Sequence, residues 1–89
     1  MTSFGGDIYT AKVAQSTSID FNNGIVTSAT LTAIVTEGNF AYYLSANGGT
    51  DWELVENGVS HTFTNTGNDL KWKIEGSGRI SNIQITITH

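Results

Sequence analysis

The stretch 41-AYYLSANGGTDWELV-55 decides the fold. Residues 42–45 alternate between two faces with the two-residue period of a β-strand that has one buried side. Trp52 and Leu54 repeat this alternation farther along the stretch. Between the two segments, Asn47-Gly48-Gly49 supplies residues that accept the positive φ angles of a tight turn. The stretch therefore predicts a β-hairpin on which the core is built.

The same alternation recurs along the rest of the chain, and no window has a helical period. Asn57-Gly58 is a strong signal for a second hairpin. The pattern predicts strands at 7–14, 18–21, 25–36, 40–46, 59–64, 69–75 and 82–87, of which 25–36 is the longest and 40–46 enters the central hairpin. Seven or eight short strands joined by glycine-rich turns indicate an all-β fold, a two-layer antiparallel β-sandwich of jelly-roll type. Residues 1–6 are expected to be a flexible arm, and residues 7–89 a single domain.

The predicted core consists of the apolar residues on the inward side of these strands. They are Leu31, Tyr42, Leu44, Trp52, Leu54, Phe63, Leu70, Trp72, Ile74, Ile83, Ile85 and Ile87. Each tryptophan buries about 150–250 Å² in such a position, so a domain of this size depends on both. Tyr43 is expected to point away from the core, because its neighbours Tyr42 and Leu44 point into it.

The composition excludes several classes of partner. The net charge is −4 with four basic residues, which argues against nucleic acid. No apolar run approaches the roughly 20 residues of a membrane helix, and the first residues do not resemble a signal peptide. Thr, Ser and Asn number 13, 8 and 8, against 12 charged residues. A surface of hydroxyl and amide groups can pack against another protein without burying unpaired charges.

The sequence contains no pattern typical of a catalytic or metal site. His61 and His89 are the two histidines, and no G-x-S-x-G motif accompanies them. The acidic residues are scattered without a calcium-loop motif, although separate loops could still form a calcium site. We therefore expect no enzyme, no catalytic residue, no cofactor and no metal. A carbohydrate-binding role through an exposed Tyr43, Trp52 or Tyr9 stays open, as does an aromatic packed against a neighbouring protein.

Four segments of the second part of the chain form a pattern: 42-YYLSANGGTDWELV-55, 61-HTF-63, 67-GNDLKWK-73 and the closing 80-ISNIQITI-87. Through this pattern, residues 25–89 resemble a small β-domain that recurs in bacteriophage structural proteins. The resemblance implies a sandwich domain of tail-fibre, tailspike or baseplate proteins. Ala46-Asn47 departs from the pattern, in which an acidic residue commonly precedes the glycines.

An acidic, cysteine-free domain of this size also resembles capsid decoration (cement) proteins. That resemblance implies a homotrimer on the capsid exterior, made in the host cytoplasm without a signal peptide, with the major capsid protein and its own copies as partners. Nucleic acid and membranes are not expected partners, and a glycan is a weaker possibility. The candidate contact residues are Phe4, Tyr9, Thr30, Thr32, Ile34 and Tyr43. A tail-fibre or baseplate accessory protein and a small carbohydrate-binding module are the alternatives.

Overall fold

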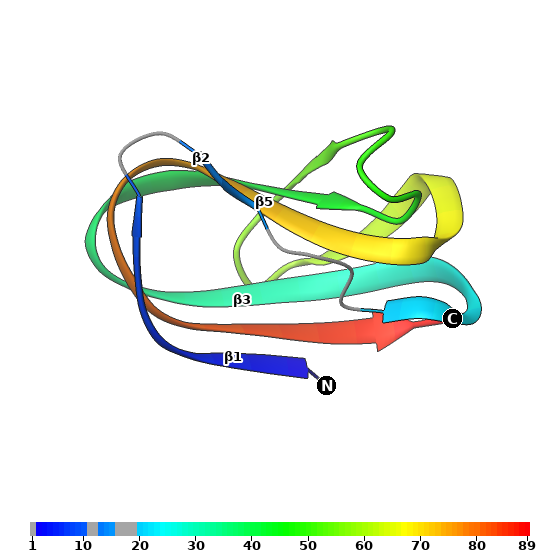
Figure 1. Ribbon diagram of the computed structural model, residues 1–89, viewed down its shortest axis with the longest axis horizontal. Helices are drawn as coiled ribbons and strands as arrows, with labels where there is room; N and C mark the ends of the chain where they lie inside the picture. Colours follow the sequence, from blue (N-terminus) through cyan, green and yellow to red (C-terminus); the bar gives the residue numbers. More distant parts are fainter. Residues whose placement is uncertain (1, 11–12, 16–19) are drawn as a thin grey trace.

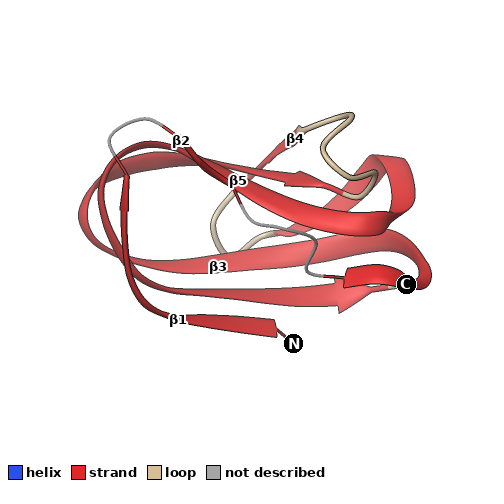
Figure 2. Cartoon of the chain, viewed as in Figure 1, coloured by secondary structure: helices blue, strands red, loops and turns tan. Residues whose placement is uncertain are grey.

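All of the regular structure in the described part of the chain is β-strand. The computed structural model describes the backbone of residues 2–10, 13–15 and 20–89 and the side chains of residues 21–89. The strands are β1 (Thr2–Thr10), β2 (Val13–Gln15), β3 (Asp20–Ser45), β4 (Glu53–Val55) and β5 (Ser60–Thr88), as Figures 1 and 2 show. Within these residues no helix could span a membrane. The predicted all-β class is confirmed.

The strands form one sheet in the order β1-β5-β3-β4, and β2 also pairs with β5. The pairing of β3 with β5 runs from Leu31 opposite Ile85 to Ser45 opposite Lys71. Residue numbers rise along β3 while they fall along β5, so the two strands are antiparallel. Several short strands expected from the sequence are therefore joined into these two long ones. In Figure 1, β3 and β5 curve together at one end of the molecule and run back.

Glycines form the corner where β3 and β5 curve. Gly38 lies opposite Gly78, and Phe40 lies opposite Gly76. Gly38, Gly76 and Gly78 have φ angles of 80°, 135° and 141°, in the region that favours glycine. A Cβ atom on Gly38 would overlap the carbonyl oxygen of Ser77, and one on Gly78 would overlap the carbonyl oxygen of Glu37. The two backbones can therefore turn side by side only because these positions lack side chains.

A single hydrophobic core collects side chains from before and after the corner. Leu31, Ile83 and Ile85 belong to the same buried cluster as Leu44 and Ile74. The predicted core residues that are buried are Leu31, Tyr42, Leu44, Phe63, Leu70, Trp72, Ile74, Ile83 and Ile85, and Ile87 packs partly buried against them. The core also contains Val26, Ala29, Ala33, Ala46, Val55 and Ile80, which the prediction omitted. The two-residue alternation thus correctly predicts most of the side chains that point into the core.

The core prediction is wrong for Leu54, which is 63% exposed, and Trp52 is only partly buried. The reason is the register of the central hairpin. Val55 pairs with Tyr42, and Leu54 pairs with Tyr43. Residues directly opposite each other share a face of the sheet. Val55 therefore joins Tyr42 in the core, and Leu54 points outward with Tyr43.

Two local predictions also change. Residues 2–5, which the sequence assigns to a flexible arm, pair with β5 from Thr2 opposite Ile85 to Gly5 opposite Asn82. The Asn57-Gly58 turn exists, with the Val59 N–H donating to the Glu56 carbonyl at 3.1 Å. However, β4 pairs with β3, and the start of β5 pairs with residues 28–30 of β3. The turn therefore connects strands that pair elsewhere and does not close a hairpin. The strand expected at 18–21 lies partly outside the described residues.

Candidate functional site

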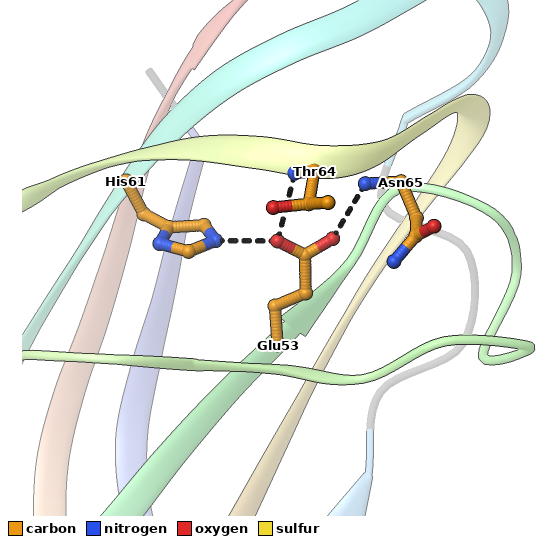
Figure 3. Close-up of polar contacts among 4 residues, drawn as sticks. All are labelled: Glu53, His61, Thr64 and Asn65. Carbon is orange, nitrogen blue, oxygen red and sulfur yellow. Dashed lines mark hydrogen bonds and ion pairs between the residues drawn. The ribbon is translucent and has the colours of Figure 1, made fainter.

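A polar cluster surrounds the carboxylate of Glu53 at the start of β4 (Figure 3). Its Oε1 atom lies 2.9 Å from His61 Nε2 and accepts the Thr64 backbone N–H at 2.9 Å, while Oε2 accepts the Asn65 N–H at 2.9 Å. The side chains of Glu53 and His61 are 12% and 24% exposed. The His61 ring meets Phe63 edge to face, with centroids 5.2 Å apart. The carboxylate therefore joins β4 to the first residues of β5.

The surroundings of Glu53 favour its charged form. Burial alone raises the pKa of this carboxyl. The N–H groups of Thr64 and Asn65 and the contact with His61 together lower the pKa by more than burial raises it, so the net pKa lies below the ordinary 4.5. A lowered folded-state pKa contributes stability that is present above the unfolded-state pKa and is lost as the pH falls through the folded value. The Glu53 carboxylate, with its contact to His61, therefore stabilises the attachment of β4 to β5, and this stabilisation decreases at acid pH.

Replacing Glu53 with glutamine should destabilise the protein at neutral pH by about 1–3 kcal/mol, because the amide loses the charge and turns a donor toward one of the two N–H groups. Denaturant unfolding over a pH series measures this. The deficit should shrink as the pH falls below 4.5, because wild type loses the same contribution. Glu56→Gln, at an exposed position, is the control and should stay near wild type. A deficit that does not change with pH would show that the Glu53 charge is not responsible.

The side-chain amide of Asn57 forms two hydrogen bonds with the backbone of β3, as a neighbouring strand would. Its Nδ2 atom donates to the Ala33 carbonyl at 2.9 Å, and its Oδ1 atom accepts the Ala33 N–H at 2.8 Å. The adjacent Gly58 N–H donates to the Leu31 carbonyl at 2.8 Å. A hydrogen bond of Asn57 also acts on Tyr42, whose pKa is raised by burial and partly lowered again by that bond. The β4–β5 turn is thereby fixed against the edge of β3.

The loop of the central hairpin is fixed by Ser45 and Asn47. The fully buried Ser45 hydroxyl donates to Asn47 Oδ1 at 2.8 Å and accepts the Gly49 N–H at 2.9 Å. Asn47 Nδ2 donates to Asp51 Oδ2 at 2.9 Å, and the Asp51 N–H donates back to Asn47 Oδ1 at 2.9 Å. These bonds satisfy the buried hydroxyl and hold the turn. Asn47 and Asp51 thus have a structural role, and the metal site left open for the loops gains no support here.

An aromatic cluster lies beside this loop, around Lys73. The Lys73 ammonium is 4.7 Å from the centroid of the Tyr43 ring and 4.9 Å from that of Trp52, within the range of cation–π attraction. It is also 3.7 Å from the carboxylate of Glu75. Leu54, opposite Tyr43 in the sheet, is exposed beside the cluster. The Lys73 ammonium therefore occupies a position from which a ligand could otherwise stack on the Tyr43 or the Trp52 ring.

A second surface is built from the outward side chains of β3 and the last part of β5. Thr30, Thr32 and Ile34 lie opposite Thr86, Gln84 and Asn82 in the register. We call these six residues the hydroxyl–amide face. Thr32 and Thr86 are exposed, Ile34 is 55% exposed, and the other three are partly buried. None of the six carries a charge. Opposed residues share a face, so these side chains form one continuous uncharged surface.

The predicted contact residues therefore do not all come together. Thr30, Thr32 and Ile34 share the hydroxyl–amide face, as their alternation in the sequence suggests. Tyr43 lies in the Lys73 cluster instead. The backbones of Phe4 and Tyr9 pair with Ile83 and Arg79 of β5, but their side chains lie outside the described residues.

Sequence reasoning did not identify the Glu53, Asn57 and Lys73 clusters. Glu53 and His61 are separated by a turn, and Asn57 and Ala33 lie 24 residues apart in the sequence, so local patterns give no signal for these contacts. Among the residues whose side chains are described, the structure has no pocket and no group of three or more histidine, aspartate or glutamate residues that could hold a metal ion. No family model, curated protein or solved structure matches the chain.

Proposed function

We propose that this protein is a virion structural protein of a bacteriophage, and specifically a capsid decoration protein that binds the outer capsid surface and stabilises contacts between capsomers. The observation that carries the proposal is the hydroxyl–amide face. Docking an uncharged, hydrogen-bonding sheet surface avoids the several kcal/mol per ion that burial of unpaired charge costs. Many such weak contacts add when copies bind a repeating lattice of subunits. The resemblance of residues 25–89 to phage structural domains supports the same assignment.

The proposed architecture is a two-layer antiparallel sandwich of jelly-roll type, in which β3 and β5 each contribute a strand to both layers. The shared corner at Gly38 and Gly78, and a core that combines Leu31 with Leu44 and Ile74, support it. In the proposed assembly, three copies associate on the capsid exterior, with the hydroxyl–amide face toward the major capsid protein. Light scattering tests the trimer in solution, and a single copy per site on the particle would exclude it.

Quantitative mass spectrometry of purified particles separates the proposed locations. A copy number comparable to that of the major capsid protein is expected for a decoration protein. A few copies per particle would indicate the tail-fibre or baseplate alternative instead, and absence from the particle would contradict both.

The face itself is tested by placing a charge on it. Thr32→Asp should reduce binding to particles that lack this protein by about tenfold or more, because docking would bury an unpaired carboxylate. Thr50→Asp makes the same change at an exposed position of the hairpin loop and should bind like wild type. Sedimentation with particles measures both variants, and circular dichroism verifies that they are folded. Equal binding by the two variants would exclude the hydroxyl–amide face as the docking surface.

The alternative function is binding of carbohydrate by the Lys73 cluster. The rings of Tyr43 and Trp52, which both lie near Lys73, favour it, because sugars stack on aromatic faces. The Lys73 ammonium, which lies over both rings, disfavours it, since a sugar would have to displace this side chain or use the opposite ring faces. A glycan array decides the question: retained glycans whose binding is lost in Tyr43→Ala would support this function over decoration.

A further inference from the structure

The surroundings of the Lys73 ammonium attract positive charge from three sides of chemistry: two aromatic rings and a carboxylate. The ammonium is 4.7 Å from the centroid of the Tyr43 ring and 4.9 Å from that of the Trp52 ring. The negative faces of aromatic rings attract cations at such distances. The Glu75 carboxylate lies 3.7 Å from the same nitrogen, which is too far for a hydrogen bond. We call Tyr43, Trp52 and Glu75 the cation cage.

The backbone of the sheet and the hairpin loop position the cation cage. Tyr43 lies opposite Lys73 in the pairing of β3 with β5, and Glu75 follows two residues later on the same face of β5. The Trp52 ring lies against the hairpin loop, because a Cβ atom on Gly49 would come within 3.2 Å of it. The two rings and the carboxylate are thus placed by separate segments of the fold, so little ordering is left for a ligand to bring about.

Lys73 is an internal occupant of the cage that another cation can replace. The side chains of Lys73 and Glu75 are 17% and 43% exposed, so the cage borders solvent. Within the described side chains no pocket is open, and a ligand therefore enters only where the Lys73 side chain moves away. A primary ammonium is strongly hydrated and regains hydrogen bonds when it returns to water. A quaternary ammonium group carries the same charge without N–H groups, so it loses less hydration on entering the cage.

From this arrangement we propose that the cation cage binds the quaternary ammonium group of a small soluble molecule, and that Lys73 competes with this ligand from within the chain. The apparent affinity is then lowered in proportion to the fraction of molecules whose cage is open. No residue of the cage belongs to the hydroxyl–amide face, so the site is independent of capsid binding. Its ligand is recognised by charge, which the carbohydrate alternative does not require.

The test titrates the full-length protein with choline and follows the indole N–H signal of Trp52 by NMR. Lys73→Ala should bind choline about fivefold or more tightly than wild type, because the competing ammonium is gone. Lys71→Ala removes a positive charge from the same strand, opposite Ser45, and should bind like wild type. Adding Tyr43→Ala to Lys73→Ala should abolish the gain. Circular dichroism verifies that each variant is folded, and Lys73→Gln takes the place of an alanine variant that does not fold.

The neutral isostere of choline, in which a carbon atom replaces the nitrogen, separates charge from shape. It should bind Lys73→Ala about fivefold or more weakly than choline does. Vesicles of phosphatidylcholine carry the same ammonium group on a membrane, and the protein should not sediment with them, because Glu75 would repel the neighbouring phosphate.

Three outcomes would overturn the proposal. The first is equal affinity of wild type and Lys73→Ala for choline, and the second is equal affinity of Lys73→Ala for choline and its isostere. The third is sedimentation with the vesicles that choline reverses, which would assign the ammonium group to a lipid and contradict a soluble ligand. None of these results bears on decoration, which the copy number per particle tests separately.

Discussion

Replacing Gly38 with alanine should destabilise the protein by roughly 2–6 kcal/mol, the sum of the penalty for a left-handed backbone and of overpacking. The added methyl group would overlap the carbonyl oxygen of Ser77, which belongs to the neighbouring strand and is fixed by the sheet. Relief requires β3 and β5 to separate at the corner. A loss of this size is a large part of the stability of a small domain. Thermal and denaturant unfolding measure it.

Gly58→Ala is the matched control for this variant. Gly58 has nearly the same φ angle, 79° against 80° at Gly38, but no atom lies within 4 Å of the position that its Cβ would take. Gly58→Ala should lower the free energy of unfolding by only about 1–2 kcal/mol, the cost of a left-handed backbone conformation for alanine. If the two variants are equally stable, β3 and β5 do not approach each other closely at Gly38.

Truncation of Trp72 to alanine is the second change with a large expected effect. Trp72 is 7% exposed within the core, and removal of a buried tryptophan side chain costs about 3–5 kcal/mol through lost burial and the cavity that remains. The variant should therefore be largely unfolded or melt far below wild type in a denaturant titration.

Leu54→Ala is the comparison that tests the hairpin register. The side chain of Leu54 is 63% exposed beside Tyr43, so its removal should change stability by about 0.5 kcal/mol or less, as is usual for surface positions. A loss comparable to that of Trp72→Ala would place Leu54 in the core and contradict the pairing of Tyr42 with Val55.

The sequence was sufficient for the strand class and for most of the inward side. Leu70, Trp72 and Ile74 alternate with charged residues, and this local pattern indicates that the three apolar side chains point into the core. It was insufficient for Leu54, because the face of a strand after a loop depends on the register that the loop imposes. Leu54 and Val55 are adjacent apolar residues, and the alternation alone does not choose between them.

Local sequence patterns could not predict the corner at Gly38 or the polar clusters, for a different reason. Gly38 precedes Asn39, a combination typical of a turn that ends a strand, and the structure instead curves one continuous strand there. The difference depends on Gly78, a residue far away in the sequence that lies opposite Gly38. The contacts of Glu53 with Asn65 and of Asn57 with Ala33 likewise exist only after the sheet has formed. Of the candidate contact residues, the alternation located Thr30, Thr32 and Ile34 correctly on one face.

The pairing of β3 with β5 also has a consequence for how fast the chain folds. Leu31 and Ile85 are neighbours in the sheet, yet about three fifths of the chain lies between them. Such high contact order requires long loops to close before the pairing gains any energy, and comparable all-β domains fold in about milliseconds to seconds. During that interval the unpaired strands are exposed to neighbouring chains. Newly made copies should therefore be most vulnerable to aggregation before β3 and β5 have met, and much less so once the corner has closed.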